Sequence, residues 1–418
     1  MASFQSRIAE LAASISTHTQ RIDSYLYENK MPFPSFDADG PIDLGLPPNL
    51  ERSRNIVLEA SQELNDLLQG PRNLILNHQH NQLVPLKFIR HFWLVGKVPE
   101  NGEISYAELA GDIGVDCDAL SRILRYGIAH RIYKEPRPGF IAHSGASRLI
   151  AVDKDVANCV DFGVDDMWPA AMMTVNALER WPKAERSDQS GFALANSTEE
   201  DENFYYLMRS DKELRSRFEG AWRTYVKGPE FAVHHLTDNY PWDLLGAGTV
   251  VIADDYRGEM ATALALKYPD LHLIVQQVPP VHEEGEEVDG VNVRFMVQHV
   301  VTEQSVKDAD VYLYPWIFNL FTDQGCVNIL NSLKPALKWG SRVLVMDFVM
   351  PPPCTIPNST ERKLRALDIM KLEAGNLKER SIDEWKFVFV AADTRFVFKE
   401  LRQPLGSGFG IIEFAWEG

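Results

Sequence analysis

The chain has 418 residues, of which 45% are hydrophobic and 24% charged, as is usual for a folded globular protein with two or three domains. Its formal net charge of −17 argues against a general binder of nucleic acid or of anionic membranes, because both attract basic surfaces. No stretch approaches the roughly 18 uninterrupted apolar residues of a membrane-spanning helix, so we expect none.

The N-terminus and the cysteines indicate the compartment. The first residues, MASFQSRIAELAA, lack the basic and apolar regions of a signal peptide. Four cysteines are scattered along the chain without a CxxC pair, namely Cys117, Cys159, Cys326 and Cys354. We therefore expect a protein of the reducing cytoplasm with neither a disulfide framework nor a metal site.

Two amphipathic helices are predicted near the N-terminus. Apolar residues recur at helical spacing over residues 5–28 and again over 50–69, where Gly70-Pro71 ends the second pattern. The linker from Met31 to Pro48 is rich in Pro, Asp and Gly, so it is not expected to form regular structure. Because two such helices would have no core of their own, we expect them to pack on a later domain or on a second copy of the chain.

Residues 85–145 are predicted to form a winged helix. Ser105 and Glu108 form a capping box before the first helix, and Gly114 ends that helix in a turn. Asp116 caps the second helix, and Pro138-Gly139 forms the hairpin turn. Winged helices often bind DNA, and three arginines are candidates for phosphate contacts, namely Arg122, Arg125 and Arg131. The acidic chain and the neighbouring Asp116 and Asp118 argue against that role.

The segment from Val160 to Phe231 is predicted to be helical and is rich in aromatic residues and Met, among them Trp168, Met172 and Trp222. Such residues at helical spacing are more often core than binding site, but their density here also allows a hydrophobic pocket. His234 and His235 follow in a linker, where one is expected to be exposed and a pocket role is the alternative.

After Trp242 the pattern alternates between strands and helices, which predicts a mostly parallel, doubly wound sheet. The expected strands lie near 249–253, 271–276, 293–297, 311–315, 342–348, 387–391 and 410–415. Ligands of such sheets bind beyond the carboxyl ends of the strands. This places four segments around one crevice, 253–258, 277–280, 315–322 and 347–352.

The stretch from Gly248 to Pro280 has the outline of a nucleotide-binding β-turn-α-β unit. A working turn needs several glycines, and the next strand needs a terminal carboxylate for ribose hydroxyls. Here only Gly258 is present, Asp254 and Asp255 occupy the turn, and Gln277 stands where the carboxylate is expected. The scaffold is therefore expected to be present and its cofactor site damaged.

Several longer runs are specific in order and spacing. They are VNVRFMVQHVVTEQSVKDADVYLYPWIFNLFTDQGCVNILNSLKPALKWGSRVLVMDFVMPPP, LDIMKLEAGNLKERSIDEW, ISYAELAGDIGVDCDALSRILRYGIAHRIY and IAHSGASRLIA. In these runs, over about residues 85–418, the chain resembles fungal plant-type O-methyltransferases that use S-adenosylmethionine. The resemblance implies a Rossmann-like α/β methyltransferase fold behind an N-terminal all-α and winged-helix dimerisation domain.

The chain differs from the family at the motifs that bind the cofactor and at the position of the catalytic base. The family's first motif, roughly VDVGGGxG, reads VIADDYRG here, and its VQDLP reads VQQVP. The family's catalytic histidine, in a segment like LRWILHDWSD, falls on Asn319, and the preceding arginine falls on Pro315. Asparagine cannot remove a hydroxyl proton. Two carboxylates that partner the base in the family persist, at Asp347 and Glu379.

These departures favour a pericyclase, because the chain is similar to methyltransferase-like proteins that catalyse hetero-Diels–Alder or Alder-ene closures of polyketide-derived quinone methides, such as 2-pyridone precursors. Such a reaction needs a shaped apolar cavity and a few hydrogen-bond donors. We expect a homodimer that binds a hydrophobic small molecule and requires no S-adenosylmethionine. The alternatives are an S-adenosylmethionine-dependent O-methyltransferase with altered motifs, whose base would be Asp347, and a non-catalytic dimerisation partner.

The expected domains are dimerisation helices and linker in 1–80, a winged helix in 81–150, a pocket-forming helical segment in 151–240 and the Rossmann-like domain in 241–418. The candidate catalytic residues are Asn319, Asp347, Glu379 and His235. The candidate pocket residues are Trp168, Met172, Trp222, His234, Trp316, Phe318, Met370 and Lys371. Each has a structural alternative, since Asn319 can cap the segment before Thr322, Glu379 can pair with Lys378 or Arg380 on the surface, and the apolar residues can be core.

Overall fold

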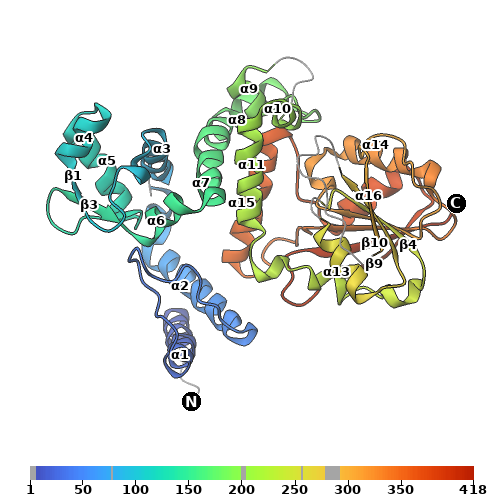
Figure 1. Cartoon of the computed structure of the whole chain (residues 1–418), viewed down its shortest axis with the longest axis horizontal. Coiled ribbons are helices and arrows are strands. Elements are labelled where there is room, and N and C mark those ends of the chain that lie inside the picture. Colours follow the sequence, from blue (N-terminus) through green and yellow to red (C-terminus); the bar gives the residue numbers. More distant parts are fainter. Residues whose placement is uncertain (1–5, 77–78, 199–203, 256–257, 278–291) are drawn as a thin grey trace. The chain divides into compact units, whose positions relative to one another are not determined.

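The computed structural model describes residues 6–76, 79–198, 204–255, 258–277 and 292–418 (Figure 1). The chain forms two compact units, each built from several segments. Unit 1 comprises Met1–Trp168, Ser216–Thr224 and Pro353–Lys363, and unit 2 comprises Pro169–Arg215, Tyr225–Pro352 and Leu364–Gly418. In the part of the chain that the structure describes, no helix is both long and apolar enough to cross a membrane.

Unit 1 begins with two long helices, α1 (Arg7–Glu28) and α2 (Pro48–Ile75), which pack against each other. The expectation that they lack a core of their own is wrong, because Leu26, Leu46 and Leu50 form a small buried cluster. Leu46 of this cluster comes from the linker, and Asp37 of the linker forms an isolated β-bridge with Ser144. The predicted end of the second helix at Gly70-Pro71 is confirmed, because Gly70, with a φ of 69° and a ψ of 169°, is not helical and divides α2 into two helical stretches.

The elements expected for residues 85–145 are present. They are α3 (Leu83–His91), β1 (Ile104–Ser105), α4 (Tyr106–Ile113), α5 (Cys117–Ala129), β2 (Tyr133–Lys134), β3 (Phe140–His143) and α6 (Gly145–Val152). Ser105 and Asp116 cap helices α4 and α5 as predicted, and Gly114 ends α4 in the left-handed conformation. The three strands form an antiparallel sheet in the order β1-β3-β2.

The three arginines considered for phosphate contacts have partners within the chain. Arg125 donates two hydrogen bonds to Glu135, at 3.0 and 2.9 Å, and the guanidinium of Arg131 lies 4.8 Å from the ring centre of Phe36. Arg122 is exposed and lies 3.8 Å from Asp118.

Later segments complete unit 1. Helix α7 (Lys154–Asp161) and the π-helix Phe162–Met167 belong to it, whereas α8 (Trp168–Arg180) belongs to unit 2 after its first residue. Most of α11 (Lys212–Tyr225) then returns to unit 1. Arg217 of α11 donates two hydrogen bonds to the buried Asp166, at 2.7 and 2.8 Å. Helix α15 (Asn358–Gly375) begins here, and Glu59 of α2 accepts hydrogen bonds from its first two backbone N–H groups, at 2.8 and 2.7 Å.

Unit 2 contains a seven-stranded sheet in the order β6-β5-β4-β7-β8-β10-β9. Its strands are β4 (Thr249–Ala253), β5 (His272–Gln277), β6 (Val293–Val297), β7 (Val311–Pro315), β8 (Arg342–Asp347), β9 (Phe396–Arg402) and β10 (Gly410–Trp416). Strands β4 to β8 are parallel, and β10 runs antiparallel to its neighbours β8 and β9. The prediction of a mostly parallel, doubly wound sheet is therefore confirmed.

One predicted strand is wrong. Residues 387–391 lie in helix α16 (Ile382–Ala392), and the strand that follows, β9, was missed. Ser381 and Glu384 form a capping box that starts the helix, and Trp385, Val388 and Phe389 then share its buried face at helical spacing. Phe389 stacks on Phe414 of β10 with ring centres 3.6 Å apart.

Helices cover both faces of this sheet. Helices α14 (Asp323–Leu333) and α16 pack together on one face, and α13 (Glu259–Lys267) lies on the other (Figure 1). The shorter helices of unit 2 are α9 (Gly191–Asn196), α10 (Phe204–Ser210) and α12 (His234–Thr237). Parallel strands β4, β5, β7 and β8 all end at one edge of the sheet, where the described residues of the predicted crevice follow them.

Candidate functional site

A buried polar pair lies at the carboxyl ends of β7 and β8. Asn319, in the short helical turn Phe318–Leu320, donates a hydrogen bond from Nδ2 to Oδ1 of Asp347, at 2.9 Å. The same oxygen accepts a hydrogen bond from the backbone N–H of Phe348, at 2.9 Å. Asn319 is thus held by the carboxylate, whereas the cap of helix α14 is Thr322.

Asp347 retains one unused acceptor. Its side chain is fully buried, and Oδ2 makes no hydrogen bond to any residue that the structure describes. Burial raises the pKa of Asp347, while the positive charge of Lys371 and the hydrogen bond from Asn319 oppose that rise. A buried carboxyl group with a raised pKa and a free oxygen is typical of a site that handles protons or ligands.

A second carboxylate belongs to the same cluster. Glu379 forms an ion pair with Lys371, and the side chains of Glu379 and Lys371 are only 1% and 14% exposed. Burial raises the pKa of Glu379 to about 7, the charge of Lys371 opposes the rise, and the nearby Asp347 adds to it. Glu379 therefore pairs with Lys371 in the interior, and not with Lys378 or Arg380 on the surface.

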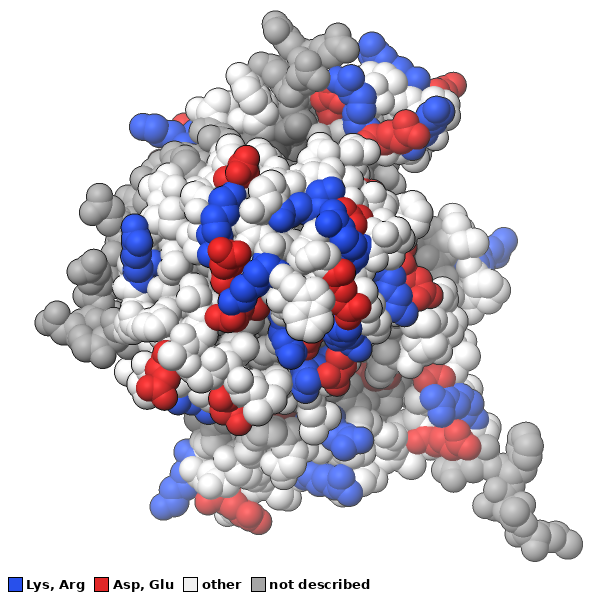
Figure 2. Space-filling view, turned by 90° about the vertical axis from the view of Figure 1, so that its right-hand side faces the viewer, with Lys and Arg blue, Asp and Glu red and all other residues white. Residues whose placement is uncertain are grey.

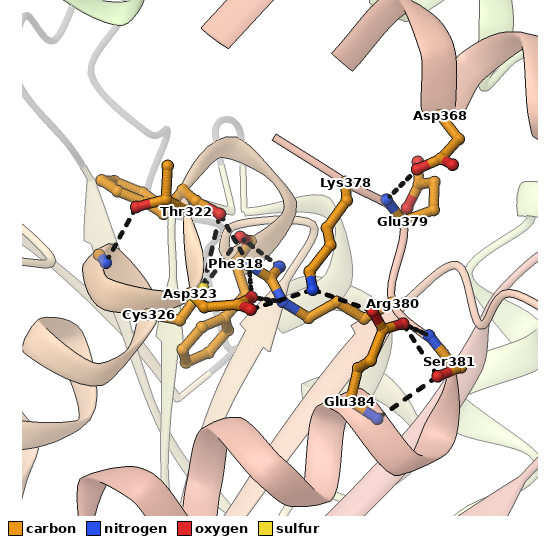
Figure 3. A network of polar contacts seen from close by, with 12 residues as sticks. Phe318, Thr322, Asp323, Cys326, Asp368, Lys378, Glu379, Arg380, Ser381 and Glu384 are labelled. Carbon is orange, nitrogen blue, oxygen red and sulfur yellow. Dashed lines mark hydrogen bonds and ion pairs between the residues drawn. The ribbon is translucent and has the colours of Figure 1, made fainter. Parts of the chain in front are cut away.

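Arg380 braces the turn that carries Asn319 (Figure 3). Its fully buried guanidinium donates to Asp323 at 2.9 Å and to the carbonyl oxygens of Phe318 and Phe321 at 3.2 and 2.9 Å. These carbonyls flank Asn319, so Arg380 fixes the position of the amide. This residue was not predicted, although it directly follows Glu379 in the run LKERS.

An aromatic cluster borders the polar groups. Phe409 lies at the centre, with its ring 4.7 Å from Phe348, 4.8 Å from Phe231 and 5.1 Å from Trp316. Trp316 has a φ of 55°, a strained conformation for a bulky residue that is common at functional sites. Phe231, Phe348 and Phe409 were not predicted, because they come from three distant segments that only the fold brings together.

The other predicted residues are spread over the structure. Phe318 is fully buried in the core under α16, Met370 is half-buried on α15, and Met172 is 68% exposed on α8. Trp168 and Trp222 are half-buried in unit 1. In unit 2, His235 is buried with Nε2 3.0 Å from the carbonyl oxygen of Pro229, and the ring of His234 lies 4.2 Å from that of His235.

The acidic turn after β4 is organised around Asp255. Its carboxylate is 5% exposed and accepts hydrogen bonds from the backbone N–H groups of Met260 and Ala261, at 3.4 and 2.8 Å. Asp255 thus caps helix α13 from within the turn, and its side chain is turned into the protein. Gly258 has a φ of 72° and contacts Phe295 so closely that a Cβ would lie 2.6 Å from that ring.

Burial raises the pKa of Asp255 from 3.8 to about 6, against the two backbone hydrogen bonds that lower it. The folded protein then holds this proton more tightly than the unfolded chain does. We expect the free energy of unfolding to fall by about 3 kcal/mol as the pH rises from about 4 to 6. Asp255→Asn should remove this part of the pH dependence in urea titrations, whereas the exposed control Asp254→Asn should keep it. Identical pH profiles for Asp255→Asn and the unmodified protein would contradict this assignment.

The turn and the end of the next strand carry two hydrogen-bond acceptors. Ala253 and Gln276 are register partners on adjacent strands, so the exposed Asp254 and the buried Gln277 follow neighbouring strand ends. A carboxylate and an amide oxygen in these places have the chemistry that ribose hydroxyls require. Residues 256–257 and 278–280 of the predicted crevice lie outside the described residues. Within the described ranges, no group of three or more His, Cys, Asp or Glu is placed to hold a metal ion.

The surface in Figure 2 carries basic and acidic side chains interspersed on one face of the molecule. Ion pairs of this kind on the outer strands of unit 2 join Arg402 to Glu400, at 2.6 Å, and Lys399 to Glu417. Because cations and carboxylates alternate, the described part of this face lacks the single positive field that phosphate backbones attract.

Comparisons with known sequences agree on one family, and solved structures share the fold. The model of the O-methyltransferase domain matches residues 248–394. The chain is 35% identical to O-methyltransferase gsfB of Penicillium aethiopicum over the full length of both proteins. Solved structures of OxaC with SAH and oxaline and of LepI with SAM cover 97% of the chain and the whole of each neighbour, with TM-scores of 0.73 and 0.70 and 18% identity.

These findings contradict the expectation that S-adenosylmethionine binding is lost. The family model, which covers the turn after β4, and the relative both describe O-methyltransferases. The expectation was wrong because it assumed that the side chains of the turn would fill the cofactor's space. Asp255 instead folds back to cap helix α13.

Proposed function

Since the chain belongs to the O-methyltransferase family, we propose that it transfers a methyl group from S-adenosylmethionine to a hydroxyl oxygen of a small fungal secondary metabolite. The observation that supports this best is the buried cluster of Asn319, Asp347, Glu379 and Lys371 at the carboxyl ends of the strands. The cluster offers donors, acceptors and one cation to a substrate oxygen, in the region where such folds bind their ligands.

The residues present fit the cofactor. Asp254 and Gln277 would hold its ribose hydroxyls, in place of the single carboxylate expected after β5. When bound, the cofactor supplies an electrophilic methyl group on a positively charged sulfur. Every other requirement, including orientation of the substrate and removal of its proton, falls on side chains of this chain.

Asn319 orients the substrate in this proposal. Its amide is fixed by Asp347 and, through the surrounding backbone, by Arg380. An amide can hydrogen-bond a hydroxyl but cannot accept its proton at neutral pH. The proton must therefore go to a carboxylate or leave with the solvent before the oxygen reacts.

The substrate is expected to be hydrophobic and aromatic, and the enzyme to be a homodimer. The cluster of Phe231, Trp316, Phe348 and Phe409 supports an aromatic substrate, because aromatic rings pack well against one another. A second copy is supported by apolar side chains of α1 and α2 that are each at least 41% exposed, namely Ile8, Leu58, Leu67, Leu68, Leu74 and Ile75.

The first test is transfer of an isotope-labelled methyl group from S-adenosylmethionine to a panel of phenols and phenolic polyketides, with products read by mass spectrometry. We expect a labelled methyl ether and micromolar cofactor binding by calorimetry, with a dimer mass in sedimentation of the same sample. Absence of cofactor binding at millimolar concentration would refute the proposal. Binding without transfer to any phenol would favour the second candidate.

The second candidate is a pericyclase that closes a ring in a polyketide-derived quinone methide. It is supported by Asn319, a hydrogen-bond donor at the position where the family has its base, since polarising a carbonyl requires no proton acceptor. The protein would then change the product ratio of a spontaneous cyclisation without adding mass to the product. An unchanged ratio would exclude this activity for the substrate tested.

A further inference from the structure

The buried cluster contains more hydrogen-bonding capacity than the chain uses. Lys371 comes from α15, Glu379 from the segment after it, Asp347 from the end of β8 and Asn319 from the turn after β7. Apart from its ion pair with Glu379, Nζ of Lys371 makes no hydrogen bond to a described residue. An ammonium group has three donors, and leaving donors unpaired in the interior is costly. The cluster therefore lacks an acceptor that a ligand would supply.

An anionic acceptor fits beside Lys371 when Glu379 takes up a proton. Lys371 already neutralises Glu379, and an incoming anion would compete with that carboxylate for the same ammonium group. Burial raises the pKa of Glu379 to about 7, so this carboxylate can take up a proton near neutral pH when an anion replaces it. The other charged groups that act on Glu379 are the carboxylates of Asp347 and Asp368, which both favour its protonated form.

We propose that Lys371 binds the reacting oxygen of the substrate as an anion, and that the enzyme therefore selects acidic phenols, which carry electron-withdrawing groups on the ring. The proton of the substrate hydroxyl moves to Glu379, and Lys371 exchanges its ion-pair partner from the Glu379 carboxylate to the phenolate. Lys371 and Glu379 would thus prepare an oxygen nucleophile, and S-adenosylmethionine, when bound, would supply the methyl group and keep the electron pair of its carbon–sulfur bond. This inference rests on the function proposed above.

The chemistry of the exchange sets the substrate class. A simple phenol has a pKa of about 10, so its proton transfer to Glu379 is less favourable, by a factor of about 10³, than that of a phenol whose own pKa is about 7. A phenol whose own pKa lies near 7 or below has no such penalty. Asn319 cannot lower this barrier, because its amide does not accept protons at this pH.

The test uses 4-nitrophenol, whose anion absorbs in the visible range, and needs no methyl transfer. Spectra of the protein-bound ligand recorded across pH should give a pKa at least about one unit below that of free 4-nitrophenol, because a cation within contact distance favours the anion. Lys371→Met should abolish the shift and weaken binding of the anion about 10-fold or more, and Lys371→Arg should retain the shift. Circular dichroism would verify that each variant is folded.

Lys378→Met is the matched control. Lys378 lies seven positions after Lys371, beyond the end of α15, and pairs with Asp323 and Glu384 at 3.0 and 2.9 Å, but its side chain is 36% exposed. This variant should leave the spectrum of the bound ligand unchanged. An equal shift in Lys371→Met and the unmodified protein, or failure of 4-nitrophenol and 2,4-dinitrophenol to bind at all, would overturn the proposal.

The spectral and kinetic results separate this inference from the proposed function. A lysine-dependent shift without methylation of any phenol would uphold the anion site and refute the methyltransferase. Methylation that is as fast with simple phenols as with acidic ones would uphold the methyltransferase and refute the selectivity. We expect kcat/KM at pH 7 to be at least about 10²-fold higher for the acidic phenols.

Discussion

Replacing Arg380 with methionine is expected to lower the free energy of unfolding by about 3–5 kcal/mol, because the change removes a buried, fully used guanidinium group. Arg380 is fully buried, and its loss leaves the carbonyl oxygens of Phe318 and Phe321 without these donors. Asp323 would also lose a charged partner, although it is partly exposed and keeps Lys378. Urea unfolding of the purified variant measures the effect.

The matched control is Lys378→Met, since Lys378 also pairs with Asp323 but reaches the surface. An exposed pair of this kind contributes little, so the control should cost no more than about 1 kcal/mol. Arg380→Lys should fall between the two, because an ammonium group cannot reach a carboxylate and two carbonyls with the fork of a guanidinium. Equal losses in Arg380→Met and Lys378→Met would show that Arg380 does not brace the turn.

Asn319→His is expected to widen the substrate range. An imidazole at this position can donate from one ring nitrogen to Asp347, as the amide does now, and present the other to a substrate hydroxyl. With a base in place, methylation of simple phenols should rise about 10²-fold, because general base catalysis typically contributes that much or more. The rate for acidic phenols, which already bind as anions in our proposal, should change little.

The pH profile identifies the new base. The rate of Asn319→His with a simple phenol should rise with pH through about 6.5 and then level off, as the imidazole loses its proton. Asn319→Gln keeps the amide chemistry and should gain nothing with simple phenols. If the histidine variant gains no activity while still methylating acidic phenols, the position does not face the reacting hydroxyl.

Much of the fold could be predicted from local sequence signals. Caps at Ser105 and Asp116 and the apolar runs of the sheet act over a few residues, so their structural outcome is largely local. The failure at 387–391 has a local cause too. The run FVFV reads as a strand, but the capping box at Ser381 starts a helix that places Phe389 and Trp385 on one buried face. The signal lay six residues before the misread segment.

The site could be predicted only in part. Asn319, Asp347 and Glu379 were found because each falls on a motif, whereas the ion pair of Glu379 with Lys371 depends on how α15 packs. The sequence also does not show in which direction a side chain points. For this reason Asp255 was expected to fill the space of the cofactor, whereas its carboxylate caps helix α13. Arg380 was missed because a buried arginine cannot be told from a surface arginine until the carbonyls around it are known.

The segmented construction of unit 1 has a consequence for synthesis on the ribosome. Its last piece, residues 353–363, is translated after most of unit 2. Glu59 can form its hydrogen bonds to the backbone N–H groups of Asn358 and Ser359 only after these residues, some 300 positions later in the chain, have been translated. The N-terminal helices can form their hairpin early, but the unit they belong to closes only near the end of translation. A nascent chain interrupted before residue 353 would therefore expose the unfinished surface of α2 to chaperones.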